Sequence, residues 1–441
     1  MKRIYYSFLI LAVVFADCSL YSQNPTDSVL QNASLENCVQ YAEKHQPVMR
    51  QSLIDEQIAN REIKVQLSDW YPQLNFYGNY INNFQLQKTL FGNELVNVTT
   101  YNSSVGQISL SQTIFNRDVL LAKNTAADVR HLSKQITANK GIDLAAAVSK
   151  AFYDVLLSKE QIELIMEDII LLERNYKDAY NQYQGGIVDK TDYQRASISL
   201  NNAKAQKKTD EEQLKSNYAA LKLLMSYPPD AGLVLVYDST EMAKEAAEVD
   251  TIEQVNYVNR IEYQSLLTQK RLMEANVRYY KWGYLPTVTA FGEYNFNYLS
   301  NEFSQLYNNN YPNSYAGLSV AIPIFQGTKR VQQIKIAELQ LNRLDYDFRA
   351  LKDSISAQYQ QVLSEYKSNL INYYIQKENL QLAKEVYNII QTQYRSGIKT
   401  YLDVITANND LFSAQINYTN ALFQVLSNKV DLKRALGTLT Y

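Results

Sequence analysis

The sequence predicts a mainly α-helical protein with a small β part, built as two repeats of one plan. Three observations support this: an internal repeat, very long stretches without helix-breaking residues, and four short segments in which polarity alternates. With only 8 Pro and 13 Gly in 441 residues, the chain is poor in turns. A long chain with few turns must consist of long elements.

Residues 1–22 have the pattern of a secretion signal. Lys2 and Arg3 precede an apolar run over residues 4–15, and small and polar residues follow as far as Ser22. A basic start, a short apolar stretch and a polar cleavage region are typical of signal peptides. We therefore expect the chain to be exported and cleaved near Ser22.

Cys18 offers an alternative, because a cysteine near the end of a signal can carry a lipid. Asp17 stands directly before it, where such signals have a small residue, so plain cleavage is favoured. Cleavage near Ser22 leaves Cys38 as the only cysteine, on an apolar helical face. No disulfide framework is then available, and stability must come from packing.

The repeat has a period of 211 residues. Tyr183-Gln-Gly-Gly-Ile187 recurs as Tyr394-Arg-Ser-Gly-Ile398. The same offset relates Asp192 to Asp403, Ala196 to Ala407, Leu200 to Leu411, Ala203 to Ala414 and Leu221 to Leu432. This period is too long for a solenoid unit and indicates a duplicated half. It predicts a first repeat over residues 23–230, a linker over 231–250 and a second repeat over 251–441.

Each repeat is predicted to run helix, two strands, very long helix, tight turn, helix. The first helix is expected to begin near Ser34 and to end at Pro72, because Pro stops a helix. Its counterpart is expected to run from about Thr251 to just before Pro286.

The strands are predicted near residues 73–84, 102–114, 287–298 and 314–324, where apolar or aromatic residues alternate with polar or small ones. About 9 to 11 such residues can cross a bilayer when tilted, with the apolar face toward lipid and the polar face toward a lumen. The same alternation also fits a half-buried sheet in a soluble protein.

The helices favour the first reading. From Asn116 to Gln184 there is no Pro and a single Gly, Gly141, so the helix would be on the order of 100 Å long. A compact domain has no room for such a helix. Apolar residues recur three and four positions apart, as at Val404, Ala407, Leu411, Ala414, Tyr418, Ala421 and Val425. This is the repeat of a coiled coil, and polar residues such as Asn408 are expected on its other faces.

Four strands cannot close into a membrane barrel, because the smallest barrels have about eight. No segment of the mature chain reaches the roughly 18 to 20 apolar residues of a membrane-spanning helix. If the chain crosses a membrane, strands from several copies must therefore join. A shared barrel continued by a helical tube indicates a conduit.

Two segments carry a specific resemblance: Tyr394-Arg-Ser-Gly-Ile-Lys-Thr-Tyr-Leu-Asp403, and Leu432-Lys-Arg-Ala-Leu-Gly-Thr-Leu439. They resemble the last helical hairpin of TolC-like outer-membrane efflux proteins, and the likeness extends over essentially the whole mature chain. It implies a homotrimer with a twelve-stranded barrel in the outer membrane of a Gram-negative bacterium, continued by a long periplasmic helical tube.

The resemblance also implies function and partners. The chain would be the passive exit duct of a tripartite efflux or type I secretion system. Its partners would be a periplasmic adaptor (membrane fusion) protein, an inner-membrane RND or ABC transporter that supplies the energy, and outer-membrane lipid.

In this family the hairpin tips are the surfaces that adaptor hairpins engage. The matching positions here are Gly185, Gly186 and Ile187 in the first repeat, and Ser396, Gly397 and Ile398 in the second. A glycine after a long helix also commonly forms a left-handed C-cap, so a purely structural role is expected in addition.

The family closes its periplasmic end with a polar network, and three of its positions match Asp192, Tyr394 and Lys399. The family usually has Arg at the last position. Lys keeps the charge but loses the planar fork that pairs with a carboxylate in two ways. Asp403 matches a position of the family's acidic ring at the constriction, whereas Thr406 replaces the ring's second aspartate.

Helix capping offers a simpler role for these aspartates. Asp189 with Asp192, and Thr400 with Asp403, have the three-residue spacing of a capping box at the start of a returning helix. Acidic groups there also interact favourably with the helix dipole. The two roles are compatible.

Other function classes find little support. Lys and Arg number 43 against 45 Asp and Glu, and no basic stripe stands out, so nucleic acid is not an expected partner. There is no phosphate-binding loop, no His-Glu-x-x-His and no cysteine pair, so no enzyme, cofactor or metal is expected. The main alternative is a soluble or lipid-anchored coiled-coil scaffold of the cell envelope that forms no pore.

Overall fold

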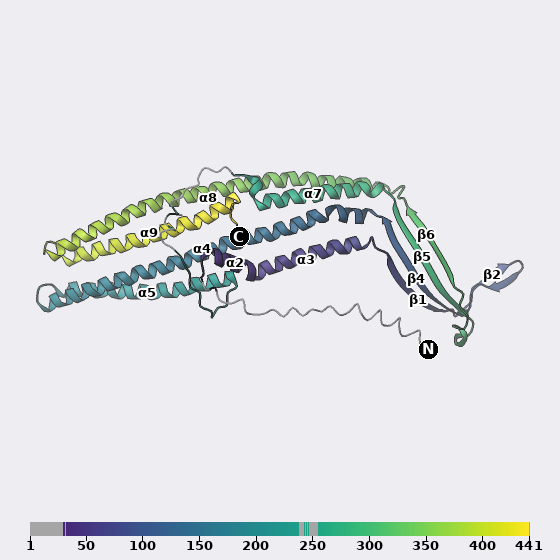
Figure 1. Cartoon of the computed structure of the whole chain (residues 1–441), viewed down its shortest axis with the longest axis horizontal. Helices are drawn as coiled ribbons and strands as arrows, with labels where there is room; N and C mark the ends of the chain where they lie inside the picture. The colour runs from purple at the N-terminus through teal and green to yellow at the C-terminus, as the bar shows by residue number, and fades with distance from the viewer. Residues whose placement is uncertain are drawn as a thin grey trace.

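The computed structural model describes residues 30, 32–237, 242, 244, 246 and 255–440. The expected secretion signal, with Cys18 and Ser22, lies outside these residues, as does the expected helix start at Thr251. The molecule is long and narrow, with a curved sheet at one end and the tips of two helical hairpins at the other (Figure 1).

The first repeat contains α2 (Leu35–His45), α3 (Pro47–Ser68), β1 (Gln73–Asn82), β2 (Lys88–Phe91), β3 (Glu94–Asn97), β4 (Asn102–Phe115), α4 (Arg117–Gln184) and α5 (Lys190–Met225). The second contains the 3-10 helix η1 (Tyr257–Asn259), α7 (Ile261–Lys281), η2 (Trp282–Tyr284), β5 (Thr287–Ser300), η3 (Phe303–Gln305), β6 (Asn313–Ala321), α8 (Lys329–Arg395) and α9 (Tyr401–Leu436).

Each long helix packs against a different helix at each of its two ends. Helix α4 packs against α3 on the side of the sheet and against α5 toward the tip, and α8 packs in the same way against α7 and α9 (Figure 1). Because one helix of 68 residues must bridge both regions without interruption, it tolerates no Pro. The expected length of about 100 Å follows from the rise per residue.

The predicted first helix is divided in two. Ser34 caps it as expected, since its side chain accepts a hydrogen bond from the Asn37 amide at 3.3 Å. The chain then leaves the helical conformation at Gln46 (φ −63°, ψ 124°) and starts again at Pro47. The cause is Pro47, because a proline disfavours helical backbone in the residue before it but fits the first turn of a new helix.

The helix of the second repeat starts later than expected, at Ile261. Arg260 holds extended backbone there, and its side chain is only 4 % exposed. Its guanidinium donates to the Glu262 carboxylate, to the Gln358 side chain at 3.0 Å and to the Ala435 carbonyl at 2.9 Å. This anchor fixes the start of α7 against α8 and α9.

The main hydrophobic core lies at mid-length, where α2, α4, α5, α8 and α9 meet. Cys38 is fully buried in it, and burial raises the pKa of its thiol to about 12. The end of α9 turns beside this core at Gly437, whose φ of 73° favours glycine. A β-carbon on Gly437 would lie 2.8 Å from the Asn259 carbonyl oxygen.

The four long strands form one antiparallel sheet in the order β1-β4-β5-β6. A single rung runs from Tyr77 through Gln107 and Asn295 to Asn313. Within the part of the chain that the structure describes, β1 and β6 are edges that pair with no further strand. The apolar face is exposed, notably at Leu74, Phe76, Ile108, Leu110, Leu318 and Val320.

A short hairpin of β2 and β3 was not expected from the sequence. It projects beyond the long strands (Figure 1) and turns at Gly92, whose φ is 63°. The Gly92-Asn93 pair between two alternating runs is a recognised hairpin signal. The hairpin was not predicted because each of its strands has only four residues.

The predicted coiled-coil seam of α9 faces the interior: Val404, Ala407, Ala414, Ala421 and Val425 are buried, and Leu411 and Tyr418 are partly buried. The expectation for Asn408 is wrong, because its side chain is 2 % exposed and faces α4. No helix among the described residues is long and apolar enough to cross a membrane.

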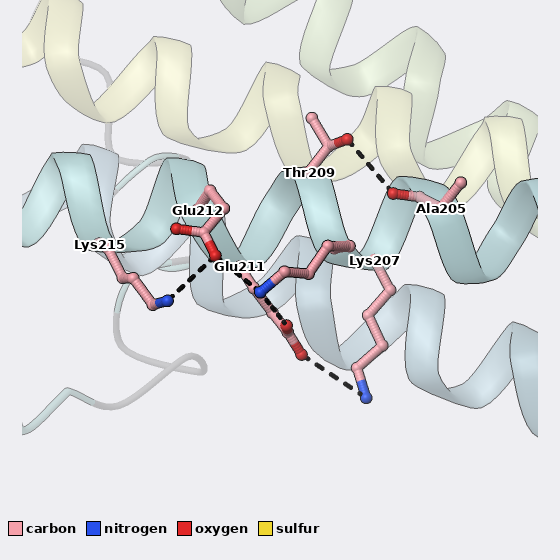
Figure 2. Close-up of polar contacts among 7 residues, drawn as sticks. Ala205, Lys207, Thr209, Glu211, Glu212 and Lys215 are labelled. Carbon is pink, nitrogen blue, oxygen red and sulfur yellow. Dashed lines mark hydrogen bonds and ion pairs between the residues drawn. The ribbon is translucent and has the colours of Figure 1, made fainter.

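The outer face of α5 carries ion pairs along the helix (Figure 2). Lys207 pairs with Glu211 at 3.7 Å, and Lys215 pairs with Glu212 at 3.0 Å. Lys208 contacts both glutamates, with its Nζ 2.7 Å from Glu212. Exposed pairs of this kind contribute little to stability. They indicate that this face of α5 is exposed to solvent.

Candidate functional site

The tip of the first hairpin is a Schellman turn. The Ile187 amide donates to the Gln182 carbonyl at 2.9 Å, and the Gly186 amide donates to the Tyr183 carbonyl at 3.0 Å. These two bonds satisfy carbonyls at the end of α4, and the left-handed position falls on Gly186 (φ 72°). Gly185 remains right-handed (φ −79°). The turn leaves Ile187 75 % exposed.

The second tip repeats this geometry. The Ile398 amide donates to Gln393 and the Gly397 amide donates to Tyr394, both at 2.9 Å. Gly397 takes the left-handed position (φ 76°), and Ser396 stands where the first tip has Gly185. Ile398 is 72 % exposed. The expected glycine C-caps are confirmed, and each tip presents one apolar side chain.

The two predicted capping boxes have different outcomes. Thr400 and Asp403 form one: the Asp403 amide donates to the Thr400 hydroxyl at 3.4 Å, and the Thr400 amide donates to the Asp403 carboxylate at 2.9 Å. The box predicted for Asp189 and Asp192 is wrong. Asp189 caps α5 through the Lys190 amide, whereas the Asp192 amide donates to the Asp189 carbonyl.

The Asp403 carboxylate is held as an anion. Hydrogen bonds from the Thr400 amide and hydroxyl, followed by the charge of Lys399, lower the pKa of Asp403. The Lys399 ammonium lies 3.9 Å from this carboxylate. Within one chain, Lys399 is therefore directed toward Asp403.

Tyr394 is oriented by the other hairpin. Its hydroxyl donates to the Gln182 side chain at 3.3 Å, so the second hairpin is tied to the end of α4. Tyr401 lies next to it, with ring centroids 6.2 Å apart. Tyr401 is 5 % exposed, and its hydroxyl has no hydrogen-bond partner among the described residues. Burial, then Tyr394 and the charges of Asp192 and Asp178, raise the pKa of Tyr401.

The structure thus places the predicted gate residues at one end of the molecule, beside an aromatic cluster. Asp192 lies half-buried in the first turn of α5 and close enough to Tyr401 to influence its ionisation. The side chains of Tyr176, Tyr180, Tyr183 and Tyr193 pack against one another, with ring centroids 4.9 to 6.3 Å apart. The hydrogen bonds of Tyr394 and the ion pair of Lys399 go to Gln182 and Asp403 instead of Asp192.

A buried polar contact joins the hairpins further from the tip. The Asn408 amide donates to the Asp168 carboxylate at 2.7 Å. Burial raises the pKa of Asp168, and the hydrogen bond from Asn408 opposes this in part. The contact links α4 to α9 inside an otherwise apolar seam.

Sequence reasoning missed Tyr401, Gln182 and Asp168. Tyr176, Tyr180 and Tyr183 recur at helical spacing on one face of α4, and this was the available signal for an aromatic cluster. Nothing in the sequence pairs Asp168 with Asn408, because the contact depends on how two helices 240 positions apart are aligned.

Comparison with known proteins identifies the architecture. The family model described as "Outer membrane efflux protein" matches residues 38–226 and 259–438. Outer membrane protein TolC of Escherichia coli strain K12 is 23% identical over 429 residues, which cover 93% of this chain and 84% of that protein.

Two solved structures share the fold. The transmembrane channel CusC superposes with a TM-score of 0.74 at 16% identity, covering 95% of each chain. The outer membrane protein VceC of Vibrio cholerae superposes with a TM-score of 0.70 at 13% identity, covering 91% of this chain and 96% of its own.

Proposed function

The chain belongs to the outer membrane efflux protein family, and from this membership we propose that three copies assemble into one continuous duct. As a member of the family it is an outer-membrane export channel with a long periplasmic tube. It is the exit duct of a tripartite efflux or type I secretion system and has no catalytic role. It works with an adaptor and an inner-membrane transporter.

The observation that carries the assembly is the open sheet. Strands β1 and β6 end the sheet with unpaired backbone groups, and such edges are not stable in a lipid environment. Pairing β6 of one copy with β1 of the next removes both edges. Three copies then give twelve strands, within the range of closed membrane barrels.

A second exposed surface supports the same assembly. Helix α8 carries a stripe of apolar side chains that are 50 to 61% exposed in the single chain: Ile371, Ile375, Leu382, Val386 and Ile389. Their spacings of four, seven, four and three follow a coiled-coil seam. We infer that a neighbouring copy covers this stripe, which completes the helical tube.

The sheet is suited to contact with lipid. Its exposed apolar face would lie against the hydrocarbon, and both tryptophans of the chain, Trp70 and Trp282, lie where helices meet strands. Lys123 stacks on Trp70 at 5.3 Å, and Arg330 stacks on Tyr284 at 4.3 Å. Aromatic and basic side chains favour the boundary between membrane and water.

The closed end would be formed by contacts between copies. The ion pair between Lys399 and Asp403 is long, at 3.9 Å, and the Lys399 side chain is 40% exposed, so its ammonium can also reach Asp192 of a neighbouring copy. We infer a latch made of Asp192, Tyr394 and Lys399 around the acidic position Asp403. Gly185, Gly186, Ile187, Ser396, Gly397 and Ile398 form the surface that an adaptor would contact, and the exposed Ile187 and Ile398 would anchor it. We propose an RND or an ABC transporter as the inner-membrane partner.

Conductance in planar lipid bilayers tests the duct and the latch together. The detergent-purified protein is expected to form ion-conducting channels of low resting conductance. Lys399→Ser and Asp192→Ala should each raise that conductance, because each removes one partner of the latch.

Lys208→Ser and Glu212→Ala are matched controls on the outer face of α5, and they should leave conductance unchanged. If no variant and no wild-type sample conducts, the duct is wrong. If all conduct equally, the latch is wrong, and Asp192 and Lys399 have only local roles, as a first-turn residue of α5 and as the ion-pair partner of Asp403.

A further inference from the structure

The four long strands contain a single charged side chain, Glu293. It lies near the middle of β5, which runs over 14 residues from Thr287 to Ser300. At about 3.3 Å per residue, Glu293 lies roughly 20 Å along the strand from Thr287. A sheet that spans the membrane would therefore hold this charge at mid-depth, where an ionised group is costly and is typically functional.

Two partners fix the side on which Glu293 lies. The Gln107 amide of β4 donates to its carboxylate at 2.6 Å, and the Tyr315 hydroxyl of β6 donates to the same oxygen. In the register of the sheet, Glu293 stands opposite Ser109 and Tyr315. All these residues belong to the polar face, and the apolar residues Leu110 and Tyr294 belong to the other.

The hydrogen bonds do not require a charge. Both partners of Glu293 donate, and the amide oxygen of a glutamine could accept from both donors with the same side-chain shape. If packing were the only role of position 293, a neutral glutamine would fill it with a smaller desolvation penalty than an ionised glutamate. Within the four described strands there is no Lys or Arg that could pair with the negative charge.

We propose that Glu293 sets the charge preference of the barrel lumen in favour of cations. The inference rests on the proposed trimer, in which three copies of Glu293 form one carboxylate ring on the lumen wall. Rings of acidic side chains favour cations in channels. Because the hydrogen bonds from Gln107 and Tyr315 hold each carboxylate in place, the charges act at one height.

The test is the reversal potential of single channels in planar bilayers under a KCl gradient. Replacement of Glu293 by Gln should lower the permeability ratio of K⁺ to Cl⁻ by at least about two-fold at low salt. Glu293→Lys should move the preference toward Cl⁻. The difference should fade toward 1 M salt, where the Debye length falls to about 3 Å from about 30 Å at 0.01 M.

Two further variants separate charge from structure. Tyr315→Phe removes one hydrogen bond and leaves the charge, so it should retain the wild-type permeability ratio. Every measurement is repeated in an Asp403→Asn background, so that the acidic position at the opposite end does not mask the lumen.

The outcomes are distinguishable. If channels conduct but Glu293→Gln and Glu293→Lys keep the wild-type ratio at low salt in both backgrounds, Glu293 has only a structural role and the inference is overturned. If wild-type protein forms no conducting channel, the proposed function fails and the inference fails with it. A ratio that drops equally in Tyr315→Phe would also contradict a role of the charge.

Discussion

At the scale of single residues, Gly437 is the position that tolerates replacement of its residue type least. Its left-handed backbone and the 2.8 Å approach to the Asn259 carbonyl act together. Gly437→Ala should therefore lower the free energy of unfolding by about 2 kcal/mol or more, because both backbone strain and a clash with backbone result. Thermal unfolding in detergent measures the effect.

Gly232→Ala is the matched control. Gly232 has open space around its α-carbon and lacks the left-handed backbone, so its replacement should change stability little. Equal effects at Gly232 and Gly437 would mean that the packing of α9 against residues 259 and 260 is not as described.

The lowered pKa of Asp403 predicts that the stability of the protein depends on pH. Its pKa is lower in the folded protein than the value of about 3.9 for an unfolded aspartate. Its contribution is therefore complete above about pH 4 and is lost as the pH falls through the lower folded pKa. Below pH 4, wild-type protein should lose more thermal stability than Asp403→Asn, whose side chain does not titrate. Parallel stability curves for the two proteins would refute this.

Residue roles were predictable where they depend on local spacing. The caps at Gly186, Gly397, Ser34 and Thr400 follow from neighbours a few positions away. The role of Asp192 was not predictable, because whether it caps α5 depends on the backbone of one turn. The buried environment of Tyr401 depends on two hairpins that lie far apart in the sequence.

At the scale of elements, the apolar stripe on α8 makes a definite prediction. Leu382→Asn combined with Val386→Asn should weaken the trimer, because each buried side chain of this kind contributes roughly 1.5 to 3 kcal/mol. The trimer should dissociate at a lower temperature in detergent, as measured by light scattering. Leu90→Asn with Leu95→Asn, two residues of the β2–β3 hairpin that are even more exposed, should leave the trimer intact. An undiminished trimer in the α8 variant would place this stripe outside the interface.

Element types were more predictable than element ends. The 68 residues of α4 and the four long strands follow from strong patterns with few interruptions. The break at Gln46 follows from Pro47, but the helical pattern continues on both sides of this proline, so a single helix was predicted. The β2–β3 hairpin was missed because strands of four residues offer too little alternation to be recognised.

At the scale of the whole molecule, three surfaces of the described chain lack a partner that a neighbouring copy could supply. Among the described residues, the sheet has two free edges at one end and the α8 stripe is exposed along the tube. At the other end, the hydrogen bond of Tyr394 goes to Gln182 and the ion pair of Lys399 goes to Asp403, so neither pairs with Asp192. The proposed threefold assembly would provide partners for all three. The 211-residue repeat indicated two similar halves, but the packing of whole chains is not encoded in any local pattern.

The mass of the protein extracted with detergent from washed outer membranes tests this account most directly. We predict a detergent-dependent particle of three chains, each about 50.7 kDa before any processing. A monomer or dimer recovered from the soluble periplasm would contradict the duct and would favour a coiled-coil scaffold instead.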